Sequence, residues 1–339
     1  MLLHPNIKVN LGLDILRKRP DGFHDIETLF LPCDDFHDCL EVLPADEPSA
    51  LIHDVLSRVS ALRNSASASA FGSGSTSDSG SASATDSACI PISDPSIASD
   101  STPTPDSSAG ASASDPASDY AWRQAISEDG KVMITIFREA GVDWDPLKDL
   151  CVKAYRLLDA DFNLPSVKIV LEKFSPVGAG LGGGSADAAY TLLALNELFS
   201  LGLTQSQLVS YAARLGSDCA FFIYNKPMFG SGRGEILSEY PMDDFASHYV
   251  VRCYIPEGIA VSTAQAYAGV TPFVPEVSLR ERLAEPVELW RDSLFNAFEP
   301  GIVRLHPSLT SLKEKIYADG AIYASMSGSG SAFFGIFPR

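Results

Sequence analysis

The feature that most constrains this fold is a short stretch, residues 178–184, called here the glycine loop. The preceding residues 167–171 are β-branched and apolar, and they predict a buried strand. Apolar side chains recur at helical spacing over residues 188–195, which predicts a helix with Ser185 as its N-cap and an end near Gly202. A strand, a flexible turn and a helix therefore follow one another. The glycines of the turn are Gly178, Gly180, Gly182, Gly183 and Gly184.

Such a turn favours the binding of an anion. Glycines let backbone N–H groups come close to a ligand, and the unpaired N–H groups at a helix start attract negative charge. Each glycine also lowers stability, because it loses more conformational entropy on folding than other residues do. A turn without a ligand would not need so many glycines. The glycine loop therefore predicts a phosphate site. Lys173 either adds a positive charge to it or is a solvated lysine at a strand end.

Two common phosphate motifs do not fit the glycine loop. Residues 178–183 match the pattern G-x-G-x-x-G, but a dinucleotide fold also needs a second strand that ends in an acidic residue about 20 positions later. Residues 201–208 instead predict a turn and a new helix. A Walker A loop needs Lys directly before its final Ser or Thr, and Gly184 occupies that position before Ser185. Both motifs are excluded.

The rest of the chain predicts a mixture of strands and helices. The helix that follows the turn at Gly202 begins with a capping box of Thr204 and Gln207 and ends at Gly216. Further strands are expected at residues 7–13, 39–43, 132–137 and 249–254. Further helices are expected at residues 150–158, 279–283 and 308–317, and a closing strand, turn and strand at residues 321–337.

Residues 64–119 differ in composition from the segments around them. More than half of these residues are Ser or Ala, Asp is frequent, and neither Lys nor Arg occurs. Such a segment cannot bury enough apolar surface to offset the entropy of ordering, which is roughly 1–2 kcal/mol per residue for the backbone. The sequence predicts a disordered acidic insertion, either a modifiable tether or solvated filler. The remaining chain is long enough for one two-lobed enzyme.

Charge and cysteine usage limit the possible partners. The 339 residues carry a formal charge of −18, which disfavours nucleic acid and anionic membranes. No apolar run approaches the roughly 18 residues that span a bilayer, and Lys8 stands where a signal peptide would be apolar. The cysteines are scattered, without the spacing of a zinc site. We therefore expect a cytoplasmic protein with reduced thiols.

Three stretches together resemble the GHMP kinases, a family of small-molecule kinases with its own phosphate loop. Residues 176–189 resemble the second motif of that family, residues 6–13 the first and residues 326–331 the third, in the same order and context. The resemblance implies a two-domain α+β GHMP kinase fold that carries the disordered insertion. The implied N-terminal ATP-binding domain spans residues 1–240 and contains the insertion at about residues 64–119. The implied C-terminal substrate domain spans residues 241–339.

Residues 18–30, 215–222 and 232–237 narrow the resemblance. They are similar to the GHMP kinases that act on the cytidine diphosphate conjugate of methylerythritol. The implied reaction transfers the γ-phosphoryl of ATP, with Mg²⁺, to the 2-hydroxyl of that substrate, in the non-mevalonate route to isoprenoid precursors. Two alternatives stay open: another GHMP kinase, for homoserine or mevalonate, and a GHMP-fold sensor without turnover. The expected assembly is a monomer or weak homodimer that binds neither nucleic acid nor membrane.

The resemblance assigns catalysis to Asp218 and Lys8. Asp218 matches the catalytic aspartate of the family and would accept the proton of the reacting hydroxyl. Lys8 matches the catalytic lysine and would stabilise the developing alkoxide. Without the resemblance, Asp218 after Gly216 and Ser217 fits a helix cap, and Lys8 fits a charge at a strand edge.

The resemblance also implies which residues bind the substrate. Phe23 and His24 match the pair that holds cytosine, although relatives usually carry Tyr at the position of Phe23. Tyr267 would contact the other face of the base, and Asn10 matches a substrate contact of the first motif. Asp149 stands where many relatives have Asn near the adenine, which leaves the nucleotide contacts at that position open.

By the same resemblance, the glycine loop would hold the triphosphate of ATP. Because the whole chain is acidic, the attraction must come from loop N–H groups, the helix start and the metal. Ser185 would lie near a phosphate or near Mg²⁺, which is expected on ATP with no other protein ligand. The residues expected to bind ATP are Pro176, Val177, Gly178, Ala179, Gly180, Leu181, Gly182, Gly183, Gly184, Ser185 and Ala186.

Overall fold

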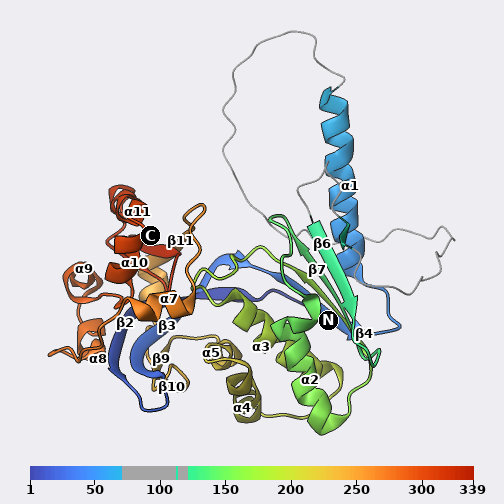
Figure 1. Cartoon of the computed structure of the whole chain (residues 1–339), viewed down its shortest axis with the longest axis horizontal. Coiled ribbons are helices and arrows are strands. Elements are labelled where there is room, and N and C mark those ends of the chain that lie inside the picture. The colour runs from blue at the N-terminus through green and yellow to red at the C-terminus, as the bar shows by residue number, and fades with distance from the viewer. Residues whose placement is uncertain (71–111, 114–120) are drawn as a thin grey trace.

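The structure is a computed structural model that describes residues 1–70, 112–113 and 121–339. Figure 1 shows two halves side by side, with a large sheet and its helices on the right and the C-terminal helices on the left. Within the described ranges, no helix is both long and apolar enough to cross a bilayer.

The right half is built on a six-stranded mixed sheet. Strands β7 and β8 pair in parallel, and the other neighbours pair antiparallel. β8 lies between β4 and β7 and is covered on both faces, which explains its nearly continuous apolar sequence. In spatial order the strands are β1 (Leu2–Leu3), β4 (Cys39–Pro44), β8 (Val167–Glu172), β7 (Val132–Arg138), β6 (Ala121–Ile126) and β5 (Ser112–Ala113).

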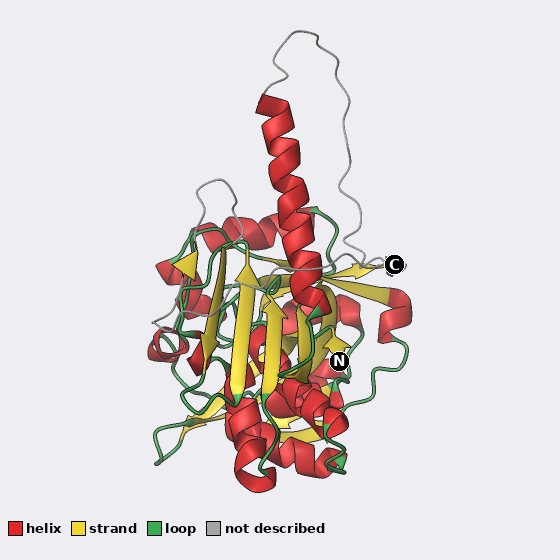
Figure 2. Cartoon of the chain, turned by 90° about the vertical axis from the view of Figure 1, so that its right-hand side faces the viewer, coloured by secondary structure: helices red, strands yellow, loops and turns green. Residues whose placement is uncertain are grey.

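Helices cover both faces of this sheet, because successive side chains of a strand point to opposite faces. Ile169 and Leu171 of β8 join the core beneath α2 and α3, whereas Val170 packs with Leu51 and Val55 of α1. Figure 2 shows α1 running beside the sheet and extending past its end. The helices of this half are α1 (Ala50–Ala70), the short 3₁₀ helix η1 (Pro146–Lys148), α2 (Leu150–Phe162), α3 (Gly183–Leu198), α4 (Gln205–Leu215) and α5 (Cys219–Tyr224).

A second sheet of four strands lies against the C-terminal elements, in the left half of Figure 1. Ile7 and Val9 of its strand β2 point into a core shared with the C-terminal strands. The alternate residues Lys8 and Asn10 are buried polar groups on the opposite face. In spatial order the strands are β10 (Ile236–Glu239), β9 (Met228–Ser231), β3 (His24–His37) and β2 (Asn6–Lys18).

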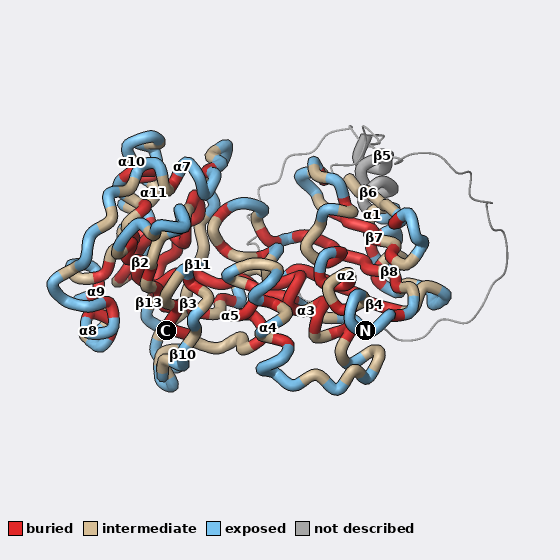
Figure 3. The backbone as a smooth tube through the Cα atoms, turned by 60° about the horizontal axis from the view of Figure 1, so that its bottom comes forward, coloured by how far each residue is buried: buried red, intermediate tan, exposed pale blue. Residues whose placement is uncertain are grey.

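The left half contains a three-stranded antiparallel sheet and short helices. In Figure 3 buried backbone, drawn in red, runs through both halves. The strands are, in spatial order, β11 (Tyr249–Tyr254), β13 (Phe333–Pro338) and β12 (Tyr323–Met326). The helices are α6 (Phe245–His248), α7 (Thr263–Ala268), α8 (Leu279–Leu283), η2 (Val287–Leu289), α9 (Trp290–Ser293), α10 (Glu299–Leu305) and α11 (Ser308–Ala318).

The strands and helices predicted outside the insertion are all present. β2, β4, β7, β8 and β11 contain the predicted strand segments, and the closing strand, turn and strand form β12 and β13. The helix α4 has the predicted capping box of Thr204 and Gln207, with Gly216 at its end. The main differences are longer bounds, as in β2 and α2.

The predicted disordered insertion lies mostly outside the described residues. Where it is described, it differs from the prediction: α1 continues to Ala70, and β5 pairs with β6. A helix that has already formed gains one hydrogen bond for each added residue, and no Gly or Pro interrupts residues 50–70. The helix therefore propagates into the Ser- and Ala-rich segment. The domain boundary at residues 240–241 falls between β10 and α6 and stays a prediction.

Candidate active site

A cleft of about 690 Å³ lies where the two halves meet. β2 contributes Lys8 and Asn10, and the segment before α5 contributes Asp218. The glycine loop and the start of α3 form much of the lining, and the C-terminal half adds α7 and the turn between β12 and β13. All three stretches that suggested a kinase therefore reach one cleft.

The glycine loop presents the start of α3 to this cleft. The helix begins at Gly183, and its N-cap is Gly182 in the left-handed conformation, with φ of 76°. The prediction that Ser185 is the N-cap is wrong, because Gly182 adopts a conformation that lets the helix start earlier. Ser185 is instead the third residue of the helix. The unpaired N–H groups of the first turn remain available for an anion.

Gly180 brings the glycine loop against the turn before β13. A Cβ at this position would lie 2.2 Å from the carbonyl oxygen of Ser327, and the residue has φ of 81°. The Ser327 hydroxyl donates a hydrogen bond to the Gly180 carbonyl oxygen at 3.0 Å. Only glycine fits this contact between two segments far apart in the sequence.

Lys8 is fixed by three acceptors. Its ammonium group lies 2.5 Å from Asn10 Oδ1, 2.9 Å from the carbonyl oxygen of Gly180 and 3.2 Å from Asp218 Oδ2. The Lys8 side chain is 3% exposed and that of Asp218 is 33% exposed. The structure therefore brings together the two residues that the sequence assigns to catalysis, with the carboxylate open to the cleft.

Asp218 stands at the N-cap position of α5, yet its side chain makes no capping hydrogen bond. The alternative that Asp218 is a helix cap accounts for its position at the start of α5, but not for a side chain that makes no capping hydrogen bond. Asn10 contacts Lys8, and its expected contact with the substrate stays a prediction. Its Oδ1 accepts from Lys8, and its Nδ2 donates to Thr28 Oγ1 at 3.1 Å. Asn10 therefore holds the lysine, although it also lines the cleft.

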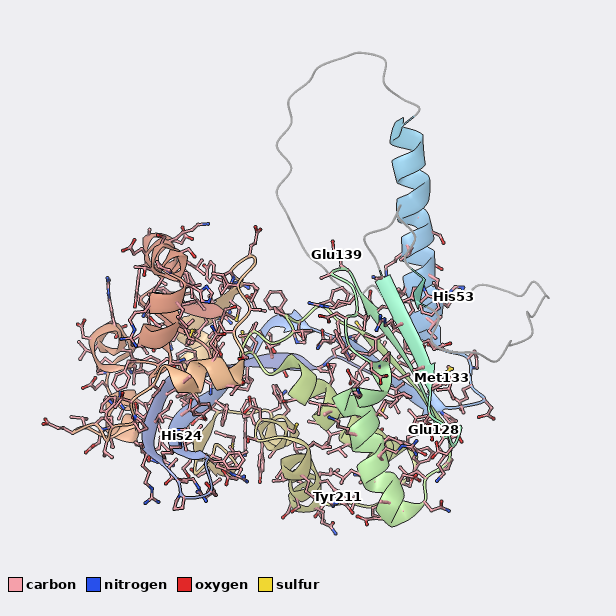
Figure 4. All side chains as sticks on the ribbon, viewed as in Figure 1. His24, His53, Glu128, Met133, Glu139 and Tyr211 are labelled. Atoms are coloured by element: carbon pink, nitrogen blue, oxygen red, sulfur yellow. The ribbon has the colours of Figure 1, made fainter. Side chains whose placement is uncertain are left out.

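Tyr267 lines the C-terminal side of the cleft, and His24 and Phe23 lie near it without being part of the lining. His24 stacks on Tyr267 with ring centroids 4.6 Å apart and an angle of 19° between the ring planes. Figure 4 labels His24 at the start of β3, near α7. The Phe23 ring is 54% exposed, with the Arg233 guanidinium 4.9 Å from its centroid. The expected arrangement places the base on the Phe23 ring, with Tyr267 against its other face and His24 as a hydrogen-bonding partner, and it stays a prediction.

Trp144 and Lys148 also line the cleft, near the start of α2. Asp149 caps this helix by accepting from the Cys151 N–H at 2.9 Å, and it accepts from Trp144 Nε1 at 3.1 Å. Asn and Asp cap helices almost equally well, so Asp149 preserves the local structure where relatives carry Asn. Trp144, Lys148 and Arg233 were not predicted as cleft residues. Trp144 and Lys148 lie outside the matched stretches, and Arg233 lies in residues 232–237, which were matched only as a stretch.

The oxygen donors of the cleft decide which metal could bind there. Within the described ranges, no group of three or more His, Cys, Asp or Glu residues is arranged to hold a metal. Hard oxygen donors do face the cleft, namely the Ser185 hydroxyl and the Asp218 carboxylate. Mg²⁺ prefers oxygen ligands and usually keeps several waters beside one or two protein carboxylates and substrate phosphates. This donor set fits a Mg²⁺ ion that enters with a nucleotide.

Comparison with known proteins agrees with this geometry. The model of the GHMP kinases N terminal domain matches residues 149–226, and the model of the C terminal domain matches residues 278–339. A 4-diphosphocytidyl-2-C-methyl-D-erythritol kinase of Bacteroides fragilis is 35% identical over 338 residues, which cover 99% of this chain and 92% of that protein. The kinase of the same name from Cytophaga hutchinsonii is 33% identical over 339 residues, with the same coverage of both chains.

Solved structures give the same result. The crystal structure of a 4-(cytidine 5'-diphospho)-2C-methyl-D-erythritol kinase has a TM-score of 0.63 and 25% identity, covering 99% of this chain and 89% of that one. A mevalonate kinase structure has a TM-score of 0.51 at 10% identity and shares the fold alone. The chain is thus an ATP-using kinase with the α+β GHMP kinase fold. Its similarity over almost the full length shows that it belongs to the 4-diphosphocytidyl-2-C-methyl-D-erythritol kinase family.

Proposed function

We propose that this chain transfers the γ-phosphoryl group of ATP to the 2-hydroxyl of 4-diphosphocytidyl-2-C-methyl-D-erythritol, a step toward isoprenoid precursors. The observation that carries the proposal is the Lys8 ammonium, held 3.2 Å from the Asp218 carboxylate at the edge of the glycine loop. We further propose that the protein works in the cytoplasm as a monomer or weak homodimer. None of the five cysteines within the described residues forms a disulfide, which suits a reducing compartment.

Lys8 and Asp218 would divide the chemistry between them. The 2-hydroxyl gives its proton to Asp218, its oxygen forms a bond to the γ-phosphorus, and the bond from that phosphorus to ADP breaks. Lys8 lies beside the carboxylate and stabilises the negative charge that develops on the oxygen. Because Asn10 and Gly180 already fix the ammonium, little reorganisation is needed when the substrate binds.

The glycine loop and α3 would hold the phosphates. Their N–H groups and the helix dipole offer a local positive potential in a chain whose net charge is −18. The Ser185 hydroxyl and the Asp218 carboxylate would hold a Mg²⁺ ion that enters with the nucleotide, and the ion would supply charge neutralisation for the phosphates. Trp144 and Lys148 lie where the adenosine end of the nucleotide would extend along the cleft.

The cytosine would bind beside Phe23, His24 and Tyr267, with Arg233 in reach of the diphosphate or of the base. Stacking of a base on an aromatic ring contributes about 1–3 kcal/mol. We therefore expect Phe23→Ala to raise the KM for the cytidine substrate by roughly 5- to 150-fold, since 1.4 kcal/mol corresponds to tenfold. The KM for ATP should stay near the wild-type value in the same steady-state assay.

Phe162→Ala is the matched control for this prediction. Phe162 is also an exposed aromatic residue, but it lies at the end of α2 and not next to His24. Its replacement should leave both KM values near wild type. An equal rise in both KM values for Phe23→Ala, or no rise, would contradict the proposed base contact.

The substrate assignment is tested by a coupled assay of ADP release with three alcohols. We expect ADP to form with 4-diphosphocytidyl-2-C-methyl-D-erythritol and to stay at background with homoserine or mevalonate. Turnover of homoserine alone would overturn the substrate assignment. Binding of the cytidine ligand without any ADP release would instead support a sensor that lacks catalysis, although the chain retains both Lys8 and Asp218.

A further inference from the structure

A buried ionic network lies directly beneath the glycine loop. Lys173, which follows the end of β8, is only 6% exposed, so it is not the solvated lysine considered from the sequence. Its ammonium donates hydrogen bonds to Asp38 Oδ2 at 2.6 Å, Ser175 Oγ at 2.7 Å and Asp187 Oδ2 at 2.7 Å. These four residues are called here the Lys173 network.

Asp38 makes most of the hydrogen bonds in the network. Its Oδ1 accepts from the backbone N–H groups of Phe174 and Ser175, each at 2.7 Å. Its Oδ2 accepts from the Ser175 hydroxyl and from Lys173, each at 2.6 Å. Within the described chain, Asp187 Oδ2 accepts from Lys173, and the buried Asp187 Oδ1 has no hydrogen-bond partner. Asp38 therefore fixes both the lysine and the segment that leads into the glycine loop.

The network also touches the loop and the helix start. A Cβ on Gly183, the first residue of α3, would lie 2.1 Å from Ser175 Oγ and 3.3 Å from Lys173 Nζ. Lys173 and Asp187 line the cleft, and Asp187 belongs to α3 itself. Asp38 lies between β3 and β4, 135 positions before Lys173. The network thus connects the segment between β3 and β4 with the glycine loop and the start of α3, where the phosphate site is predicted.

Stability alone does not explain such a network. Buried ion pairs add little net free energy, because loss of hydration offsets the attraction, but they can favour one arrangement over others. Burial raises the pKa of Asp187 well above its ordinary value. Asp38 is also buried, yet the charge and hydrogen bond of Lys173 and the hydrogen bonds of Ser175 hold its pKa below the ordinary value. Asp38 and Asp187 are thus both counter-ions of Lys173, at 2.6 Å and 2.7 Å, and Asp38 alone also binds the backbone before the glycine loop.

We propose that Asp38 is a positioning residue for the glycine loop. By holding Lys173 and the segment before the loop, it aligns the N–H groups of the loop and of α3 with the phosphates of the nucleotide. This inference rests on the proposed binding of ATP by the glycine loop. It extends that site to a side chain that is absent from the cleft lining.

The test measures how tightly the folded, full-length protein binds the imido analogue of ATP, with Mg²⁺, by isothermal titration calorimetry. Asp38→Asn keeps the shape of the side chain and its Oδ1 acceptor but removes the charge that faces Lys173. We expect the dissociation constant to rise at least about tenfold, because Lys173 loses a charge-assisted hydrogen bond and the segment before the glycine loop is held less firmly. The KM for the alcohol substrate should stay near the wild-type value.

Asp14→Asn is the matched control. Asp14 is also a buried aspartate, paired with the buried Arg282, and it does not line the cleft. Breaking this ion pair should leave the affinity for the ATP analogue near wild type. Asp187→Asn should weaken binding less than Asp38→Asn, because Asp187 accepts from Lys173 alone whereas Asp38 also holds the backbone.

A merely structural role for Asp38 would lower the melting temperature and leave the affinity of the folded protein unchanged. That result overturns the proposal, as does equal weakening by Asp14→Asn. If Asp38→Asn does not fold, Ser175→Ala, which removes the hydroxyl bonded to Asp38 and Lys173, is judged by the same criterion. Binding is measured without the alcohol substrate, so wild-type protein that binds the analogue but shows no turnover contradicts only the proposed reaction.

Discussion

The Asp218→Asn variant is expected to turn over about 10²- to 10⁴-fold more slowly than the wild type, the usual contribution of general acid–base catalysis. Asparagine keeps the shape of the side chain but cannot take the proton of the attacking hydroxyl. Because the Asp218 side chain does not cap α5, the substitution should leave the melting temperature almost unchanged. The measurement is kcat from ADP release, together with KM for both substrates and a thermal melt.

The control for this variant is Asp149→Asn. Asp149 is another aspartate of the cleft lining, and it does cap its helix, a function that Asn also performs. We expect its kcat to stay within a few-fold of the wild-type value. A kcat for Asp218→Asn within tenfold of wild type would remove Asp218 from the role of proton acceptor.

Gly180→Ala is expected to lower activity by about 10²-fold or more, since a displacement of about 1 Å in a catalytic site can cost that much. The new Cβ would stand 2.2 Å from the Ser327 carbonyl oxygen, which is backbone and cannot rotate away. The glycine loop would have to separate from the turn before β13, and Lys8 would lose the carbonyl acceptor of Gly180 in its present place. The measurement is kcat/KM for ATP.

Gly178→Ala separates this clash from backbone strain. Gly178 also has positive φ, 70° against 81° for Gly180, but a Cβ added to Gly178 would meet no atom within 4 Å. This variant should lose only the roughly 1–3 kcal/mol of folding free energy that a non-glycine residue costs in the left-handed conformation. Equal losses of kcat/KM for ATP in the two variants would show that backbone strain, and not the contact with Ser327, makes glycine necessary at residue 180.

Much of the fold could be predicted because its signals are local. The apolar run of β8, the capping box of α4 and the glycine loop each depend on neighbouring residues. The start of α3 was misplaced for a related reason: Ser185 is a good N-cap by type, but the positive φ of Gly182 starts the helix earlier. The extent of α1 depends on helix propagation, which composition alone does not report.

The predicted site residues that belong to motifs lie together in the structure, whereas other residues of the cleft were not predicted. Lys8, Gly180 and Asp218 were identified from three separate stretches, and the structure places them together. Their chemical roles remain predictions. Asp38 stands in no such stretch, and its importance comes from tertiary contacts between distant segments. Single sequences contain no local pattern for contacts of that kind.

The contact of Gly180 with Ser327 also matters while the polypeptide is being made. Ser327 follows Gly180 by 147 positions, and the strand after Ser327 pairs with both β11 and β12. On the ribosome, the glycine loop therefore leaves the exit tunnel well before the segment that packs against it. Nucleotide binding should be acquired only once Ser327 has emerged, which keeps ATP from stabilising shorter nascent chains.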